Sequence, residues 1–336
     1  MTRAARQLLW PLVPAYRLAL ALHELQLRAG LKPVRRLRWP VVSVGSLSAG
    51  GAGKTPLVMA LANALGVRRL QVDVLSRGYG RRRSGLPFLV DPGGTAEVFG
   101  DEPLEIARET LVPVYVAAKR YEAGLLAEEA IQRVSESVGQ PVRVHLLDDG
   151  FQHRQLHRDV DIVLLSRADL NDHLLPAGNL REGLRAAARA DVIAIPEDEP
   201  DVAERLQSHG CGAQVWRLRR RMDMPRIAGP VVAFCGIARP RQFFQGIAAA
   251  GVPLAESIAY ADHHRYTPRD LDRLAAVAHR AGAAALLTTE KDRVRLGTMA
   301  RNLPASLPLQ AAQLRIEIAP EAVAIDWLVA SIRAVG

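Results

Sequence analysis

One stretch of the chain restricts the fold more than any other. Residues 48–56 read Ser-Ala-Gly-Gly-Ala-Gly-Lys-Thr-Pro, between a β-branched run over residues 41–45 and a helical pattern over residues 57–65. A buried strand, a glycine-rich loop, Gly-Lys-Thr and a helix in this order are typical of a P-loop, which binds phosphate with backbone N–H groups and a helix N-terminus. A chance glycine-rich turn would lack the flanking strand and helix.

The loop supplies the candidate nucleotide-binding residues. Its glycines allow the backbone to curl around phosphate oxygens. The lysine of a P-loop reaches the β- and γ-phosphates, and the hydroxyl that follows it is a ligand for Mg²⁺. In this chain a serine stands where most P-loops have their first glycine. The candidates are Ser48, Gly50, Gly51, Ala52, Gly53, Lys54 and Thr55, with Thr55 also a candidate metal ligand.

A P-loop needs a second acidic site on a neighbouring strand to hold the metal. Residues 142–147 form an apolar run with strand character, and Asp148 and Asp149 follow it directly. Carboxylates just beyond a parallel strand face the crevice where ligands bind. The alternative is a solvated turn. The position favours metal binding.

Two other classes of P-loop protein are not supported. A GTP switch would have D-x-x-G and N-K-x-D, but Leu147 stands where the first Asp should be, and residues 288–292 place Lys and Asp side by side. A membrane-associated partitioning ATPase would have a second lysine early in the loop, where this chain has Ala49.

Strand candidates alternate with helical runs along the chain, which predicts an α/β fold with a mainly parallel sheet and helices on both faces. An irregular basic stretch over residues 216–229 is interpreted as a linker, after which a smaller α/β unit begins. We therefore expect three parts: residues 1–37 as an N-terminal segment, 38–222 as the P-loop core and 223–336 as the smaller domain. The expected strands of the core are 40–45, 70–75, 113–117, 142–147, 160–165 and 191–195, and helices are expected near 240–250, 268–282 and 321–334.

The N-terminal segment is basic and partly apolar. Residues 1–39 carry eight basic groups and one acidic group, and so hold +7 of the net charge of +9. The apolar run over residues 8–22 is shorter than the roughly 20 residues that span a bilayer. A helix at the membrane interface, a helix packed on the protein and a signal peptide are the three interpretations, and the first is favoured. A nucleic-acid binder is not supported, because the charge is confined to this segment and no reading motif is present.

Together, these motifs make the chain resemble the tetraacyldisaccharide 4'-kinase family, from about residue 8 to residue 296. The loop of this family also begins with Ser or Thr, so Ser48 is a family feature. Asn179 and Gly183 replace two prolines that are usual in it. The motifs that carry the resemblance are residues 48–56, Ser76-Arg77-Gly78-Tyr79-Gly80, Gly100-Asp101-Glu102-Pro103-Leu104, Asp148-Asp149-Gly150-Phe151-Gln152-His153, Leu175-Pro176-Ala177-Gly178, Arg181-Glu182, Phe234-Cys235-Gly236-Ile237-Ala238, Asp262-His263-His264 and Thr288-Thr289-Glu290-Lys291-Asp292.

The resemblance implies a function. The expected reaction moves the γ-phosphoryl group of ATP, with Mg²⁺, to the 4'-hydroxyl of tetraacyldisaccharide 1-phosphate, forming lipid IVA in lipid A biosynthesis. The enzyme would act at the cytoplasmic face of the bacterial inner membrane and touch the membrane through its N-terminal helix. The alternative is a membrane-associated P-loop ATPase switch without a lipid acceptor.

The resemblance also implies roles for single residues. Asp101 is the expected base, although its place before Pro103 also suits a helix cap. Its partner is His263, with His264 the adjacent alternative. Arg120 and Arg181 are expected to neutralise phosphate charge, on ATP or on the 1-phosphate of the substrate, and the alternative for Arg120 is an ordinary solvated arginine. Gln152 and His153 are expected at the γ-phosphate, Asp148, Asp149 and Glu182 at Mg²⁺, and residues 290–292 either at a ligand or in surface salt bridges.

Overall fold

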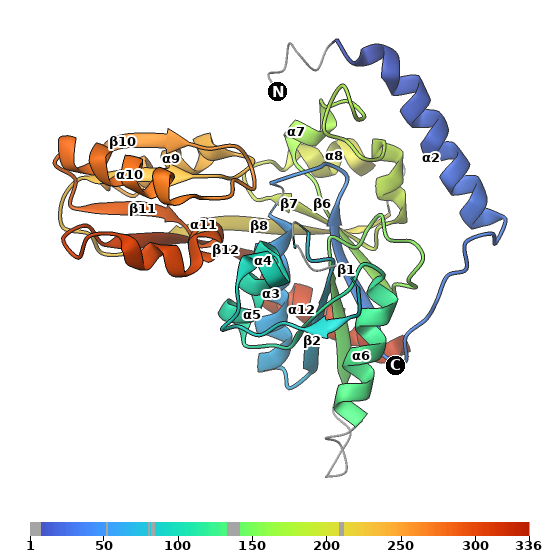
Figure 1. Cartoon of the computed structure of the whole chain (residues 1–336). Helices are drawn as coiled ribbons and strands as arrows, with labels where there is room; N and C mark the ends of the chain where they lie inside the picture. Colours follow the sequence, from blue (N-terminus) through green and yellow to red (C-terminus); the bar gives the residue numbers. More distant parts are fainter. Residues whose placement is uncertain are drawn as a thin grey trace.

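The computed structural model describes residues 8–51, 53–79, 81, 85–132, 142–207 and 212–335. Its strands form one twelve-stranded sheet in the order β10-β9-β11-β12-β8-β7-β6-β1-β5-β2-β4-β3 (Figure 1). Their bounds are β1 Val41–Ser46, β2 Gln71–Ser76, β3 Phe88–Leu89, β4 Val114–Val116, β5 Arg143–Asp148, β6 Val160–Leu164, β7 Val192–Pro196, β8 Gln214–Asp223, β9 Val231–Cys235, β10 Leu254–Ala259, β11 Ala285–Thr289 and β12 Leu309–Ala319.

Helices surround this sheet. The α-helices are α2 Val13–Arg28, α3 Lys54–Val67, α4 Ala96–Phe99, α5 Asp101–Thr110, α6 Arg120–Gln132, α7 Arg167–Leu170, α8 Asp201–Gln207, α9 Pro240–Ala249, α10 Pro268–Arg280, α11 Glu290–Leu296 and α12 Glu321–Val335. The short 3-10 helices are η1 Trp10–Leu12, η2 Leu184–Arg189 and η3 Gly297–Asn302. Among the described strands, only β8 with β12 and β3 with β4 pair antiparallel, so the expected mainly parallel α/β sheet is confirmed.

Helices cover both faces of the sheet, because the central strands alternate their buried side chains. In β1, Val42 and Val44 join the cluster that packs under α3 and α12, whereas Val41 joins the cluster under α6. Leu146 and Leu147 of β5 divide in the same way. A strand that is apolar on both faces requires cover on both, which is why the expected runs were nearly continuous in apolar residues.

A smaller lobe built from β9, β10, β11, α9 and α10 stands beside the main body (Figure 1). The prediction of an irregular linker over residues 216–229 is wrong up to Asp223, since these residues belong to β8. Trp216 and Leu218 are buried and alternate with exposed Arg217 and Arg219. The many arginines on the exposed face hide this period-2 pattern in the sequence.

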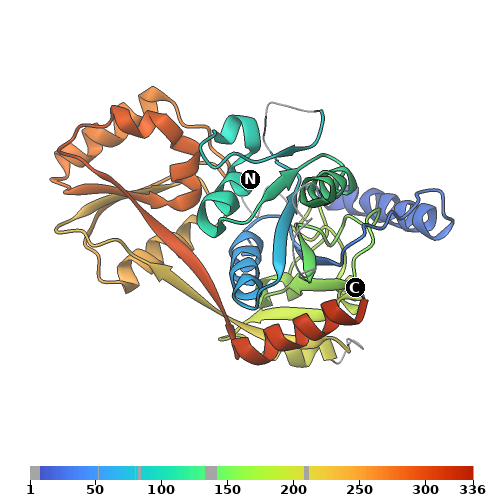
Figure 2. The ribbon, with the colours of Figure 1, turned by 90° about the horizontal axis from the view of Figure 1, so that it is seen from below.

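Two long strands join the lobes. Residues 313–319 of β12 pair antiparallel with residues 217–223 of β8, and Figure 2 shows this ribbon running from the smaller lobe to the larger one. The helix expected near 321–334 exists as α12, but Ile325 and Leu328 pack into the core of the main body. The expected part 223–336 therefore does not map onto a single lobe, because its last helix returns to the other core.

Helix α2 lies at the edge of the molecule (Figure 1). Of its residues only Val13 is buried, while Leu18, Leu22 and Leu25 are more than half exposed. Tyr16 attaches it to the body, because its hydroxyl donates to the carbonyl oxygen of Arg181 at 2.9 Å. Over the residues that the structure describes, every helix is too short or too polar to cross a membrane.

Candidate active site

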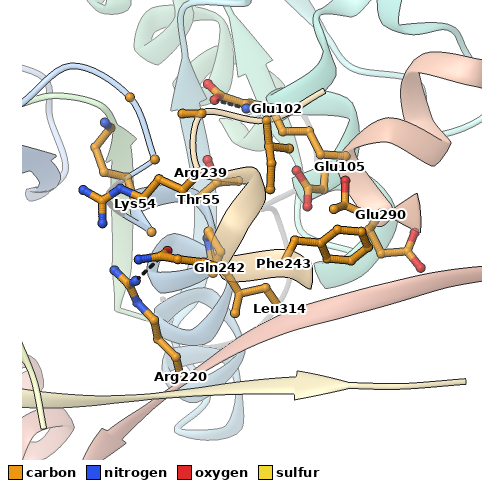
Figure 3. Close-up of a pocket in the computed structure, with 18 of the residues that line it drawn as sticks. Lys54, Thr55, Glu102, Glu105, Arg220, Arg239, Gln242, Phe243, Glu290 and Leu314 are labelled. Atoms are coloured by element: carbon orange, nitrogen blue, oxygen red, sulfur yellow. Dashed lines mark hydrogen bonds and ion pairs between the residues drawn. The ribbon is translucent and has the colours of Figure 1, made fainter. Parts of the chain in front are cut away.

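A cavity of about 1420 Å³ opens between the two lobes. Figure 3 shows Lys54 and Thr55 on one side of it and Glu105 and Glu290 on the other. The helix N-terminus of α3, the C-terminal ends of β2 and β5, and the smaller lobe all contribute to its walls. This is the edge of a parallel sheet at which ligands bind.

The P-loop glycines adopt backbone conformations that other residues rarely do. Gly50, Gly51 and Gly53 have φ angles of 81°, 45° and 91°, and all three line the cavity. A Cβ atom at Gly51 would lie 3.2 Å from Ala238 and Arg239, so the smaller lobe closes over the loop at contact distance. The loop therefore offers backbone N–H groups to a ligand held between the lobes.

For two predicted loop residues, Ser48 and Ala52, the outcome differs from that of the glycines. Ala52 lies outside the described residues. Ser48 is 2% exposed, bridges to Leu180 and is not among the residues that line the cavity. The structure therefore places Ser48 behind the loop, where it supports the chain instead of facing a ligand.

Lys54 is held by polar groups at the cavity floor. Its Nζ lies 3.2 Å from Ser46 Oγ and 3.4 Å from Asp149 Oδ1. Asp149 also accepts from Arg181 at 2.8 Å, and Arg181 donates to Gln152 at 3.2 Å. Burial alone would raise the pKa of Asp149, but the charges of Lys54 and Arg181 outweigh it and lower that pKa. The predicted Lys54, Asp149, Gln152 and Arg181 thus form one network.

Asp148 provides the clearest position for a metal ion. It is 3% exposed; Ser76 donates to its Oδ2 at 3.3 Å, and its buried Oδ1 has no hydrogen-bond partner. Burial, with help from nearby Glu102, raises its pKa. A buried carboxylate oxygen without a partner, in the cavity that the P-loop residue Thr55 also lines, fits the oxygen ligands that Mg²⁺ prefers.

Glu182 does not join this group. Its Oε2 lies 2.8 Å from Arg189 Nη2. Glu182 is not among the described residues that line the cavity. Neighbouring side chains of this segment therefore point in different directions: Arg181 binds Asp149, whereas Glu182 binds Arg189. In the described parts of the chain, this site included, no cluster of three or more His, Cys, Asp or Glu is arranged to hold a metal by itself.

Arg120 enters the cavity at the start of α6. It is 7% exposed, and its Nε has no partner. Burial lowers its pKa to about 10, with a further contribution from Arg77, so the guanidinium stays charged. Burial and these arginines also lower the pKa of His153 to about 4, which leaves a neutral imidazole. A buried cation without a carboxylate partner is suited to a phosphate group.

At the other end, Asp101 and His263 meet across the two lobes. His263 Nδ1 lies 3.0 Å from Asp101 Oδ2. Helix α5 has Gly100 at its N-cap, so Asp101 is its first residue and not its cap. His264 instead binds Asp270 at 3.2 Å and stacks on Tyr260, away from this pair.

The sequence reasoning missed Arg295. Its Nε and Nη2 donate to Asp101 Oδ2 at 2.7 and 2.5 Å, and its Nη1 donates to Asp292 Oδ1 at 2.9 Å. The spacing of Asp292 and Arg295, three apart on a helix, was a usable signal for an ion pair. Nothing in the sequence indicated the contact with Asp101, 194 residues away.

Residues 290–292 also join the lobes. Lys291 Nζ donates to Glu102 Oε1 at 2.7 Å, and the neighbouring carboxylates raise the pKa of Lys291 even though burial opposes this. Glu105 and Glu290 line the cavity beside them, and burial raises the pKa of Glu105 to about 8. Asp292 is fully buried and receives Gly236 N–H at 3.1 Å. Ion pairs of this motif are therefore present, partly buried between the lobes, and Glu290 and Lys291 also line the cavity.

Comparison with known proteins identifies the family of this chain. A family model described as tetraacyldisaccharide-1-P 4'-kinase matches residues 5–333. The chain belongs to this family. It is 38% identical to the tetraacyldisaccharide 4'-kinase of Koribacter versatilis, over 88% of this chain and 89% of that protein. It is also 38% identical to the tetraacyldisaccharide 4'-kinase of Geobacter metallireducens, over 90% and 92% of the two chains.

The tetraacyldisaccharide-1-P 4'-kinase family also includes a solved structure with this fold. It is the crystal structure of LpxK from Aquifex aeolicus, titled an apo form in complex with ATP. Its TM-score is 0.73 at 30% identity, and the match covers 98% of this chain and 99% of that one. The two chains therefore share one fold over almost their whole length.

Proposed function

We propose that this chain is an ATP-dependent kinase that phosphorylates the 4'-hydroxyl of tetraacyldisaccharide 1-phosphate to form lipid IVA in lipid A biosynthesis. The observation that carries the proposal is the cavity, which joins a P-loop from one lobe to an acid–histidine pair that needs both lobes. Family membership supplies the substrate, since the matched relatives are named for this reaction.

The P-loop end would bind ATP and Mg²⁺. The residues for the triphosphate are Gly50, Gly51, Gly53 and Lys54, and those for the metal are Thr55, Asp148 and Asp149. A bound Mg²⁺ would neutralise charge on the β- and γ-phosphates. Arg120 would stabilise the charge of the transferring group, because a loose phosphoryl transition state is helped mainly by positioning and electrostatics.

The second end would bind the acceptor sugar. A hydroxyl nucleophile loses its proton as it attacks, so a base must lie within hydrogen-bond reach. The Asp101–His263 pair, where the two lobes meet, is the candidate for this base. Closing two lobes around both substrates also excludes water, which would otherwise take the phosphoryl group.

The N-terminal segment would contact the cytoplasmic face of the inner membrane. Leu18, Leu22 and Leu25 lie on one exposed face of α2, and the surrounding segment is basic. Such a helix binds the interface of an anionic bilayer without spanning it. Sedimentation of the chain with anionic vesicles, but not with neutral ones, is the expected result. Equal binding to both would contradict it.

Transfer of label from γ-labelled ATP to tetraacyldisaccharide 1-phosphate in detergent tests the activity. We expect labelled lipid from the wild-type chain and a fall of about 10²–10³-fold for Arg120→Met, because a charge-stabilising donor is lost. Arg301→Met, an exposed arginine far along the chain, is the control. ATP hydrolysis stimulated by membranes, with no lipid product, would support the ATPase switch instead.

A further inference from the structure

Helix α2 touches the body of the protein beside the phosphate end of the cavity. The Tyr16 hydroxyl donates to the carbonyl oxygen of Arg181 at 2.9 Å. Arg181 lines the cavity, and its Nη1 donates to both carboxylate oxygens of Asp149, at 2.9 and 2.8 Å. Building on the proposed kinase function, we propose that Tyr16 is a positioning residue for Arg181. Its hydroxyl holds the backbone from which the guanidinium reaches the phosphate end.

The backbone of Arg181 is held on both sides of its Cα atom. Its N–H donates to the carbonyl oxygen of Leu47, the residue after β1, at 2.7 Å. Its own carbonyl oxygen accepts from Tyr16. Because the side chain leaves the Cα atom between these two groups, both bonds restrict where the guanidinium can lie. The first bond comes from the sheet, and the second comes from α2.

The residues just before Arg181 lie against the chain that leads into the P-loop. The N–H of Ala49 donates to the carbonyl oxygen of Asn179 at 2.8 Å, and Ser48 forms an antiparallel bridge with Leu180. Arg181 therefore follows a short stretch that is already paired with the end of β1. The Tyr16 bond lies at the far end of this stretch, where the pairing with the sheet stops.

Two further contacts hold α2 and the turn before it. The ring of Trp10, in η1, packs on His173 with 4.8 Å between the ring centroids. Glu24 forms an ion pair with Arg154, two residues after Gln152. One contact thus reaches each of the two segments that carry the polar network of the cavity. The tyrosine lies between these two anchors, so its bond does not depend on a helix held at a single point.

The Tyr16 hydroxyl acts as the donor in its contact, because a carbonyl oxygen only accepts. Burial, and after it the charge of Glu182, raise the pKa of Tyr16, and the opposing charge of Arg181 contributes less. The hydroxyl therefore keeps its hydrogen through the neutral pH range. Tyr16→Phe removes this one hydrogen bond and leaves the ring in place.

The two faces of α2 have different partners. With 3.6 residues per turn, Tyr16 and Glu24 lie on the side toward the body, and Leu18, Leu22 and Leu25 lie on the opposite side. These leucines are the residues that the proposed function places at the membrane. The bond to the phosphate end can therefore persist while the opposite face of the helix meets a bilayer.

Hydrogen exchange of the backbone tests the positioning step without turnover. A peptide over residues 175–182 contains the N–H of Arg181, which is bonded to Leu47. We expect Tyr16→Phe to speed exchange in this peptide about fivefold, because the segment loses one hydrogen bond and opens more easily. Tyr260→Phe is the control, since its buried hydroxyl has no hydrogen-bond partner in the described parts of the chain. Unchanged exchange in Tyr16→Phe would overturn the proposal.

Phosphate transfer then shows whether Tyr16 acts through Arg181. Tyr16→Phe should lower kcat for lipid phosphorylation about fivefold and leave KM for ATP within twofold, because the P-loop itself is intact. In an Arg181→Met background the same substitution should change kcat by less than twofold, since the side chain that it positions is gone. Equal losses in the two backgrounds would mean that Tyr16 does not act through Arg181, and would overturn the proposal.

The two levels of the argument fail separately. Absence of lipid product from the wild-type chain would contradict the proposed kinase function. The exchange measurement needs no substrate, so it would still decide whether Tyr16 holds the segment that carries Arg181. Lipid product from the wild type, with normal kcat and normal exchange in Tyr16→Phe, would leave the kinase function standing and remove Tyr16 from it.

Discussion

The two ends of the cavity are built in different ways. At the phosphate end, Gly50, Gly51, Gly53 and Lys54 come from one loop, and the conformation of that loop follows from its glycines. At the acceptor end, His263 and Arg295 lie 162 and 194 residues from Asp101, on the other lobe. The first end requires only local chain geometry. The second exists only while two lobes are docked.

The largest expected effect is at the phosphate end. Lys54→Ala should reduce kcat by about 10²–10³-fold, because it removes a charged donor at the transferring phosphoryl group. The smaller lobe should dock as before, since Lys54 makes its polar contacts with Ser46 and Asp149. Lys119→Ala, an exposed lysine, is the control. A normal kcat in Lys54→Ala would contradict the role of Lys54 at the transferring phosphoryl group.

A second prediction concerns a buried histidine in the sheet, outside both ends of the cavity. His145, within β5, is fully buried with Nδ1 2.7 Å from Asp73 Oδ1. Burial would lower its pKa, but Asp73 and Glu128 outweigh this and raise it to about 9. The folded pKa therefore exceeds the unfolded value, so this stabilisation is complete below about pH 6.5 and is lost as pH rises through 9.

The free energy of unfolding should accordingly fall by about 3 kcal/mol between pH 6.5 and 9 as a result of this group. Denaturant titrations of the wild type and His145→Gln measure it, and the variant should lose this part of the pH dependence. His279→Gln, with an exposed ring, should keep it. An identical slope in the wild type and His145→Gln would contradict a charged His145.

The smallest expected effect concerns the docking of the lobes. The ion pair between Lys291 and Glu102 is partly exposed, so we expect a coupling energy of about 1 kcal/mol between them. A double-mutant cycle with Lys291→Ala and Glu102→Ala, read in kcat/KM, measures it. Coupling should appear in lipid phosphorylation and be absent from ATP binding. Equal coupling in both would mean that the two ends are not independent.

The difference between the ends also explains which site residues could be predicted. The structure brings Lys54, Asp149, Gln152 and Arg181 together, as expected from motifs that end neighbouring parallel strands. It places Ser48 behind the loop and turns Glu182 toward Arg189. A motif reports which residues are near a site, but not which way each side chain points.

What the sequence determined by itself is the P-loop, the mainly parallel α/β sheet and the family, because strand periodicity and glycine conformation are local properties of the chain. Tertiary structure decided the rest. It made β8 a bridging strand, returned α12 to the main core, chose His263 over His264 and brought in Arg295. These outcomes depend on contacts between residues far apart in the chain, and such contacts leave no periodic signal in either partner.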